Sequence, residues 1–328
     1  METTTSQPII DHIKEKSPRW QELKNEIKKV IVGQDHVIDR IFIGLLSNGH
    51  ILLEGVPGLA KTTLIKAVAQ ALGLSFQRIQ FTPDLLPADL VGTLVYNPKS
   101  QEFQTKKGPI FAHLILADEI NRAPAKVQSA LLEAMQEHQV TIGDNTFKLD
   151  EPFLVLATQN PIDQEGTYRL PEAQVDRFLF KILMTYPKLT EEKDIITKAF
   201  SPQAIHKIIE KDEIAFAQDL VKQVYIDDKV IEYILAIVFA SRNPKEYGLS
   251  EIAHFIEYGA SPRATLALSF ASKAHAFLKK RHFVIPDDVK AIAADTLRHR
   301  IMLTYEAEAE EITTDQIIQK ILRVIPAP

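Results

Sequence analysis

Short runs of branched and aromatic residues recur along the first half of the chain, and helical patterns separate them. The runs lie at Ile51–Leu53, Phe76–Phe81, Leu114–Leu116, Phe153–Leu156 and Phe180–Met184. Most of them are apolar without alternation, which is typical of parallel strands that are buried on both faces. Strands that alternate with helices predict an α/β domain built on a parallel sheet.

From Pro187 onward, the hydrophobic positions repeat with the period of a helix. Clear examples are Asp228–Ser241, Arg263–Leu278 and Pro286–Arg298, and prolines lie at or near the starts of the last two. We therefore expect two domains: an α/β core over residues 1–187, with an N-terminal helical segment, and an all-helical domain over residues 188–328. A chain of 328 residues also suits about two domains.

Two pairs of short strands interrupt this sheet pattern, and each pair encloses residues that favour turns. The first pair spans residues 93–105 around Asn97–Gln101, and the second spans residues 139–149 around Gly143–Asn145. Each pair predicts a β-hairpin.

The segment after the run at Ile51–Leu53 combines glycines with a lysine and two threonines, and it opens a helical pattern. This context predicts a P-loop, in which backbone N–H groups and a helix N-terminus face a phosphate. Lys61 would neutralise the β- and γ-phosphate oxygens, and the Thr62 hydroxyl would ligate Mg²⁺. The candidate nucleotide-binding residues are Gly55, Val56, Pro57, Gly58, Leu59, Ala60, Lys61, Thr62 and Thr63.

One position departs from the general motif, because Ala60 stands where a glycine is usual. A methyl group is tolerable there if the residue has a negative φ, so the departure weakens the general motif without excluding it. The alternative interpretation of the segment is a plain strand–turn–helix with a solvated lysine.

Two acids, Asp118 and Glu119, directly follow the apolar residues Leu114–Ala117. Acids that end a buried apolar strand are uncommon, because burying a charge is costly. Asp118 is placed to hold Mg²⁺, directly or through water, and Glu119 to polarise an attacking water. Joined to the P-loop, the two acids predict a nucleoside triphosphatase.

Further polar residues could complete such a site. Asn160 follows the strand at Phe153–Thr158 and could bind the γ-phosphate or the water, although it could equally cap a turn. Arg177, or alternatively Arg169, could reach a neighbouring subunit's phosphates. The alternative for Arg177 is a surface ion pair with Asp176.

Composition narrows the function classes. The chain contains no Cys, which excludes cysteine chemistry and is compatible with a reducing compartment. We find neither a membrane-spanning segment nor a signal peptide, so we expect a cytoplasmic protein without stable membrane insertion. The net charge is −5 and neither half is basic, so we expect no nucleic acid as the main partner.

Taken together and in order, the motifs resemble those of the MoxR family of AAA+ ATPases, which are similar to the magnesium-chelatase I subunit. The matching segments are Ile31–Gln34, Leu53–Thr62, Leu116–Pro124, Ala157–Pro161, Leu170–Phe178 and Gly259–Ala264.

The resemblance implies a role for each matched residue. Lys61 and Thr62 match the Walker A pair, and Ala is the family's usual residue at position 60. The other implied roles are Walker B for Asp118 and Glu119, sensor-1 for Asn160, the arginine finger for Arg177, sensor-2 for Arg263 and the adenine pocket for Val32 and Gly33. The hairpins at 93–105 and 139–149 would be the helix-2 insert and the hairpin before sensor-1.

The resemblance also implies a P-loop AAA+ parallel-sheet core with a C-terminal helical lid, and ATP or ADP with Mg²⁺ as cofactors. Family members form rings, typically hexamers, in which Arg177 would complete the neighbouring subunit's site. They often act with proteins that carry a von Willebrand factor A-type domain. The implied function is to use ATP, as a chaperone does, to remodel or mature a client protein or to insert a metal or cofactor into it. Whether Arg263 serves its own subunit's nucleotide or a neighbour's stays open.

Two alternative functions share these motifs. A ring-forming DNA motor is disfavoured because the predicted hairpins carry few basic residues, and a nucleotide-gated switch with little hydrolysis is disfavoured by Glu119 and Asn160. A protein kinase is excluded because the chain lacks HRD-type and DFG motifs.

Overall fold

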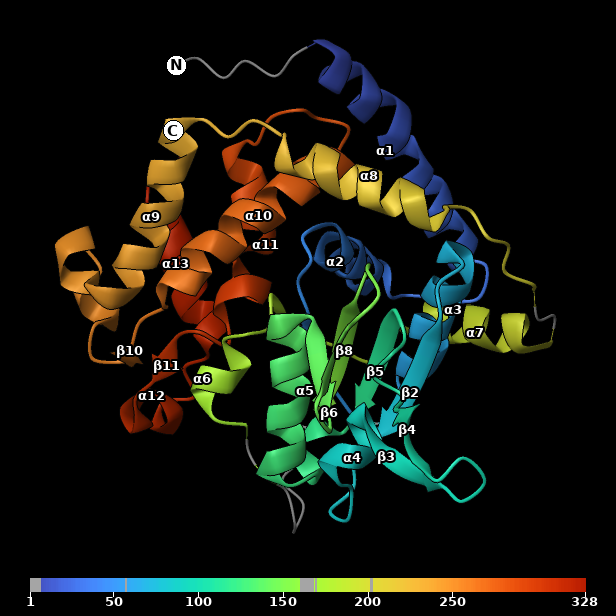
Figure 1. Cartoon of the computed structure of the whole chain (residues 1–328). Coiled ribbons are helices and arrows are strands. Elements are labelled where there is room, and N and C mark those ends of the chain that lie inside the picture. Colours follow the sequence, from blue (N-terminus) through green and yellow to red (C-terminus); the bar gives the residue numbers. More distant parts are fainter. Residues whose placement is uncertain (1–6, 57, 160–167, 169, 201–202) are drawn as a thin grey trace. The chain divides into compact units, whose positions relative to one another are not determined.

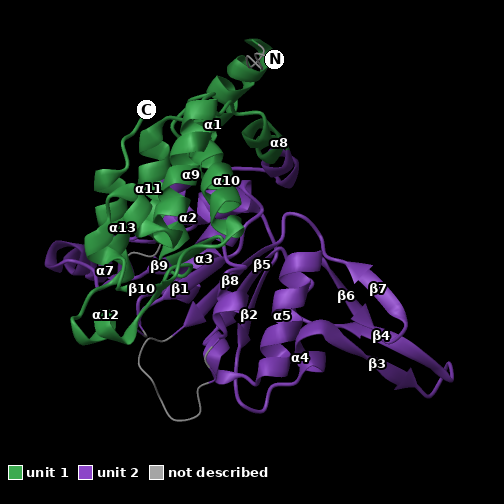
Figure 2. Cartoon of the chain, turned by 90° about the vertical axis from the view of Figure 1, so that its left-hand side faces the viewer, with its two compact units in different colours: residues 1–21, 179–181, 216–328 green, residues 22–178, 182–215 purple. Residues whose placement is uncertain are grey.

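The computed structural model describes residues 7–56, 58–159, 168, 170–200 and 203–328 (Figure 1). Contacts divide the chain into two compact units, which Figure 2 colours separately. Unit 1 comprises residues 1–21, 179–181 and 216–328, and unit 2 comprises residues 22–178 and 182–215. This division differs from a single cut near residue 187, which stays a prediction of the domain boundary.

A five-stranded sheet in the order β2-β5-β8-β1-β9 forms the core of the α/β fold. The pairings β2–β5, β5–β8 and β1–β8 are parallel, which confirms the expected parallel sheet. The five runs of branched and aromatic residues supply these strands. Their bounds are β1 Ile51–Glu54, β2 Phe76–Gln80, β5 Leu114–Asp118, β8 Leu154–Gln159 and β9 Phe180–Leu183.

Helices of unit 2 bury apolar stripes against this sheet. In α5, Val127, Leu131 and Met135 recur at helical spacing and are buried. They share one hydrophobic cluster with Ile115 of β5 and Val155 of β8. The other helices in this part are α2 Asp35–Leu46, α3 Lys61–Leu72, α4 Pro87–Val91, η1 Ile120–Arg122, α5 Ala125–Glu137, α6 Glu172–Val175 and α7 Leu189–Phe200, while α1 Gln7–Ile27 begins in unit 1 and ends in unit 2.

Both predicted hairpins are present, and they lie at the same end of unit 2 (Figure 2). The first consists of β3 Gly92–Asn97 and β4 Glu102–Lys107, and the second of β6 Gln139–Ile142 and β7 Asn145–Lys148. The Leu94 side chain packs so closely on Gly143 that a Cβ at position 143 would lie 2.6 Å from Leu94 Cδ1. The two hairpins are therefore side by side, and their roles as family-specific inserts stay predictions.

Unit 1 is mainly helical, as the change of periodicity predicted. Its helices are α9 Asp228–Arg242, η2 Pro244–Tyr247, η3 Ser250–Ile252, α10 Pro262–Leu278, α11 Pro286–Leu297, α12 Tyr305–Ala309 and α13 Thr314–Val324, together with most of α8 Lys211–Lys222. The expectation of an all-helical region was wrong in one detail, because β10 Ile256–Tyr258 and β11 Met302–Leu303 pair antiparallel. Strands of three and two residues are too short to show alternation in a sequence.

A buried charge links two helices of unit 1. The Asp288 side chain is 0% exposed, and it accepts hydrogen bonds from Arg281 and pairs with His275 of α10. These partners hold the pKa of Asp288 below its usual value, although burial by itself opposes that shift. A buried carboxylate is tolerable only when it is paired in this way.

None of the helices in the described part of the chain is long and apolar enough to cross a membrane.

Candidate active site

Two cavities of about 390 Å³ each flank the loop between β1 and α3 in unit 2. The first, here called the polar cavity, is lined by Gly55, by residues 58–63 and by Arg78, Gln80, Asp118, Glu119 and Thr158. The second, here called the apolar cavity, is lined mainly by Val30, Ile31, Val32, Leu64, Pro187 and Ile195. Gly58, Leu59, Ala60 and Thr63 border both cavities. One loop thus serves two sites of opposite character.

The loop uses its two glycines for different reasons. At Gly55, a Cβ would lie 2.9 Å from both Cβ and O of Met184, so the close approach of two backbones excludes a side chain. At Gly58 the surroundings are open, but φ is +89°, which L-residues rarely adopt. The tight path of the loop therefore depends on both positions.

Ala60 adopts a backbone conformation that is unusual for alanine. Its φ is 53° and its ψ is 27°, so it is left-handed at the N-cap of α3, and the condition under which a methyl group is readily tolerated there is not met. A left-handed residue just before a helix aims successive N–H groups at one point, as in an anion-binding nest. For an L-residue this conformation costs roughly 1–2 kcal/mol. The loop accepts this strain where a glycine would avoid it.

Lys61 begins α3 and points back along the loop. Its Nζ donates a hydrogen bond to the Gly55 carbonyl oxygen at 2.5 Å. Partial burial lowers the pKa of Lys61, while the nearby carboxylates Asp118 and Glu119 oppose that shift. The ammonium group is therefore held in the loop, close to the acids that end β5.

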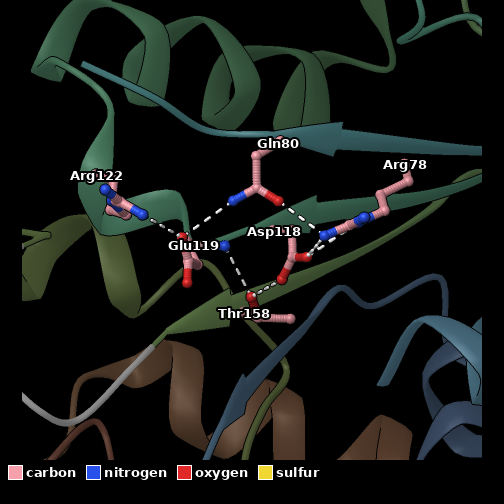
Figure 3. Close-up of polar contacts among 6 residues, drawn as sticks. All are labelled: Arg78, Gln80, Asp118, Glu119, Arg122 and Thr158. Carbon is pink, nitrogen blue, oxygen red and sulfur yellow. Dashed lines mark hydrogen bonds and ion pairs between the residues drawn. The ribbon is translucent and has the colours of Figure 1, made fainter. Parts of the chain in front are cut away.

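Both carboxylate oxygens of Asp118 have partners (Figure 3). Oδ1 accepts a hydrogen bond from Thr158 Oγ1 at 2.7 Å, and Oδ2 accepts from Nε and an Nη of Arg78 at 3.0 and 2.6 Å. Thr158 lies on β8, and Arg78 lies on β2. Because β5 lies between β2 and β8 in the sheet, Asp118 is held from both neighbouring strands.

Glu119 adopts a strained backbone conformation, with φ 57° and ψ 52°. Its N–H donates to Thr158 Oγ1 at 2.8 Å, so one hydroxyl links both acids. Its Oε2 accepts hydrogen bonds from Gln80 Nε2 at 3.0 Å and Arg122 Nη at 2.9 Å. Oε1 has no hydrogen bond within the described residues and carries no dashed contact in Figure 3. One oxygen of Glu119 is thus fixed, and the other is available to a ligand or water.

The polar cavity could hold Mg²⁺ together with a phosphate group. Thr62 and Asp118 both line it and offer hard oxygen donors, which suit Mg²⁺. No cluster of three or more His, Cys, Asp or Glu side chains able to hold a metal occurs among the residues that the structure describes. Mg²⁺ is usually held by one or two carboxylates together with phosphate oxygens and waters.

The apolar cavity suits a flat, mostly apolar group. Ile31 and Val32 come from the segment before α2, and Ile195 comes from α7. Gln34 and Gln203 also border the cavity and offer polar groups. Val32 lines this cavity, and its role in an adenine pocket stays a prediction. Gly33 follows it directly, with φ +74°, without being one of the described residues that line the cavity.

The remaining predicted residues lie elsewhere. Arg177 is exposed in the turn after α6, and its side chain makes no ion pair or hydrogen bond within the described residues. Arg263 is exposed near the start of α10 in unit 1, where its N–H donates to Ser261 Oγ at 3.2 Å. Val56 belongs to the loop but is not among the described residues that line either cavity. Pro57, Asn160 and Arg169 lie outside the described residues.

Sequence reasoning missed the side chains that surround the two acids: Arg78, Gln80, Arg122 and Thr158. A weak pattern was available for two of them. Arg78 and Gln80 flank the buried Ile79, so they lie on one face of a strand. Only the strand order, however, places β2 beside the strand that ends in Asp118.

Comparison with known families supports an ATPase core followed by its lid. Residues 50–180 match the family described as "ATPase family associated with various cellular activities (AAA)". Residues 250–321 match the AAA lid domain. The first match covers β1, β2, β5 and β8 with the loop between β1 and α3, and the second covers α10, α11, α12 and most of α13 in unit 1.

Relatives of similar length extend the likeness over almost the whole chain. The protein is 47% identical to "Chaperone MoxR1" of Mycobacterium tuberculosis, over 92% of this chain and 81% of the relative. It is 28% identical to "Protein MoxR" of Methylorubrum extorquens, over 93% of this chain and 94% of the relative. A crystal structure of a protein from Cytophaga hutchinsonii is 51% identical and superposes with a TM-score of 0.92, covering 97% of this chain and 98% of its own.

Proposed function

The chain belongs to the MoxR family of AAA+ ATPases, and on that premise we propose that it hydrolyses ATP with Mg²⁺ to remodel a client protein. One observation carries the proposal. Two pairs of residues that are distant in the sequence, Lys61 with Thr62 and Asp118 with Glu119, line one polar cavity. This cavity lies at the ends of parallel strands. Ligands of open α/β sheets bind at this edge.

In the proposed complex, the triphosphate enters the polar cavity and the base enters the apolar one. The backbone N–H groups of the loop and of the start of α3 bind phosphate oxygens. Lys61 gives up its hydrogen bond to the Gly55 carbonyl and donates to phosphate oxygens instead. Thr62 and Asp118 would hold Mg²⁺, which neutralises the charge that develops on the phosphates. The apolar lining, Val32 included, would cover the adenine ring.

In the proposed reaction, a water attacks the γ-phosphorus of ATP, the bond to the β,γ-bridging oxygen breaks, and ADP and inorganic phosphate result. Oε1 of Glu119 accepts a hydrogen bond from this water and polarises it. Gln80 and Arg122 orient the carboxylate by holding Oε2. Asn160 as sensor-1 remains part of the proposal on the family resemblance alone.

We propose that hydrolysis takes place in a ring, typically a hexamer, with Arg177 as the arginine finger. The support is that Arg177 is exposed and makes no ion pair within the described residues, so a neighbouring subunit could receive it. Arg169 is the alternative finger, and Arg263 is the proposed sensor-2 residue. A client protein, a partner with a von Willebrand factor A-type domain and a cytoplasmic location are further parts of the proposal.

The decisive experiment compares ATP turnover and ATP retention in Glu119→Gln. We expect turnover to fall about 10²-fold to 10⁴-fold, because polarisation of the water is lost, while ATP stays bound. Glu102→Gln, an exposed acid on β4, is the control and should hydrolyse normally. Full turnover by Glu119→Gln would overturn the site assignment. The same variant, held with ATP, is the bait for identifying the client by affinity capture.

The shared site has its own test. Arg177→Ala and Glu119→Gln subunits are each expected to be inactive alone, whereas mixed rings should regain some turnover, because each variant supplies what the other lacks. Subunit exchange is verified by native mass spectrometry. Mixed rings without any activity would contradict an arginine finger at position 177.

A further inference from the structure

Arg78 contacts one of the two acids, although neither the motifs nor the family likeness assigns it a role. It lies on β2, lines the polar cavity and makes two hydrogen bonds to Oδ2 of Asp118. The Arg78 side chain is 49% exposed, and the Asp118 side chain is 17% exposed. A half-exposed cation is thus paired with the carboxylate that is proposed to hold Mg²⁺.

The arrangement creates a competition for one oxygen atom. Oδ1 of Asp118 is bonded to the Thr158 hydroxyl, and Oδ2 is bonded to Arg78. A divalent cation binds carboxylate oxygens, directly or through its waters, and so does a guanidinium group. Mg²⁺ therefore has to displace one of these two partners, or share an oxygen with it.

The two partners differ in how easily they can leave. Thr158 is 1% exposed, and its hydroxyl also accepts a hydrogen bond from the Glu119 N–H. Moving this hydroxyl would therefore break two part-buried hydrogen bonds, one to each acid. Arg78 is half-exposed and borders the cavity, where phosphate oxygens would offer new acceptors. Of the two partners, Arg78 is therefore the one that Mg²⁺ can displace at the lower cost.

We propose that Arg78 is a positioning residue that occupies Asp118 in the nucleotide-free protein and gives it up to Mg²⁺ when nucleotide binds. The inference rests on the proposed function. Arg78 keeps the carboxylate paired and aimed into the cavity, and it sets the Mg²⁺ affinity by competing for Oδ2. Once released, the guanidinium group remains beside the phosphates.

Arg122 supplies a matched control, because it is a second half-exposed arginine in the same network. The Arg122 side chain is 45% exposed, close to the value for Arg78, but it pairs with Glu119 and not with Asp118. Removing either guanidinium group changes the charge of the site equally. Only the loss of Arg78 removes a competitor from the proposed metal ligand.

The experiment measures metal binding directly, with the full-length protein and the non-hydrolysable β,γ-imido analogue of ATP. Mn²⁺ replaces Mg²⁺ as the probe, and its dissociation constant is measured by electron paramagnetic resonance. We expect Arg78→Gln to bind Mn²⁺ roughly threefold to tenfold more tightly, since a partly exposed ion pair is lost. The Mn²⁺ dissociation constant of Arg122→Gln should stay within about twofold of the wild-type value. The constant of Arg78→Lys should lie between those of wild type and Arg78→Gln, because lysine keeps the charge but cannot donate two parallel hydrogen bonds.

The inference is overturned if Arg78→Gln binds Mn²⁺ as wild type does or more weakly. It is also overturned if Arg122→Gln binds Mn²⁺ more tightly by the same factor, because that result would indicate a general effect of charge. Binding of the analogue without metal, measured in EDTA, separates the two levels of the argument. If the wild-type protein binds neither nucleotide nor metal, the proposed function fails and the inference with it. If the wild-type protein binds nucleotide and metal, and Arg78→Gln binds Mn²⁺ with the same dissociation constant, only the inference fails. If Arg78→Gln does not fold, the Mn²⁺ affinity of Arg78→Lys is compared with that of wild type instead.

Discussion

The polar and apolar cavities have the same volume and share part of one loop, yet they are built in different ways. The polar cavity collects charged and polar side chains from β2, from the end of β5 and from the start of α3, with the Thr158 hydroxyl of β8 between the two acids. The apolar cavity collects branched side chains from the segment before α2 and from α7. We infer that the polar side governs hydrolysis, whereas the apolar side governs affinity without taking part in chemistry.

The difference also lies in tolerance to change. The polar side chains around the two acids hold one another, as Thr158 holds both acids, so one substitution disturbs several contacts. In the apolar cavity, contacts are non-directional, and the loss of one side chain removes only its share of buried area. Four substitutions test this contrast, from the largest expected effect to the smallest.

Lys61→Ala should have the largest effect. It removes the one ammonium group among the described residues that line the polar cavity, so ATP turnover should fall by about 10²-fold or more. A coupled-enzyme assay measures turnover, and Lys66→Ala, an exposed lysine on the same helix, should be normal. Equal losses in both variants would show that the charge of α3, and not the position of Lys61, matters.

Thr158→Val should impair both stability and turnover. It leaves the Glu119 N–H and Asp118 Oδ1 without their shared partner, so the free energy of unfolding should fall by about 1–3 kcal/mol. Urea unfolding measures the stability, and the ATPase assay measures turnover. Thr158→Ser keeps the hydroxyl and should preserve most of the turnover; a serine variant as inactive as the valine variant would argue for packing as the cause.

Ile195→Ala should weaken nucleotide binding without changing the turnover number. It removes apolar contact area from the apolar cavity, worth about 1 kcal/mol, or roughly a fivefold rise in dissociation constant. Fluorescence titration with a labelled ATP analogue measures the change. Ile196→Ala is the neighbouring control, because Ile196 is exposed and does not line the cavity. A fall in turnover number at saturating ATP would break the proposed division of labour.

Ala60→Gly should have the smallest effect, and it should be stabilising. Glycine relieves the left-handed strain of roughly 1–2 kcal/mol but loses more backbone entropy, which leaves a net gain of about 0.5–1 kcal/mol. Thermal and urea unfolding measure it. Ala130→Gly, in the middle of α5, should instead lose about 1 kcal/mol. A destabilised Ala60→Gly would mean that the methyl group makes contacts that outweigh its strain.

Much of the fold was predictable because local patterns determine local structure. Apolar runs predicted the five strands, turn residues predicted both hairpins, and helical periodicity predicted α9, α10 and α11. The short β10–β11 pair was missed, since strands of three and two residues carry too little pattern. The left-handed φ of Ala60 was not predictable, because the path of the loop sets it and residue preference does not reveal that path.

The sequence by itself determined the candidate residues for phosphate chemistry. Lys61 and Thr62 follow a glycine loop, and Asp118 and Glu119 end an apolar strand, so type and spacing suffice to propose them. Only the tertiary structure decided how these groups are held. Arg78 approaches Asp118 because β2 pairs with β5, and Thr158 reaches both acids because β8 lies on the other side. The physical reason is that strand order sets side-chain neighbours across a sheet, and no local sequence pattern specifies strand order.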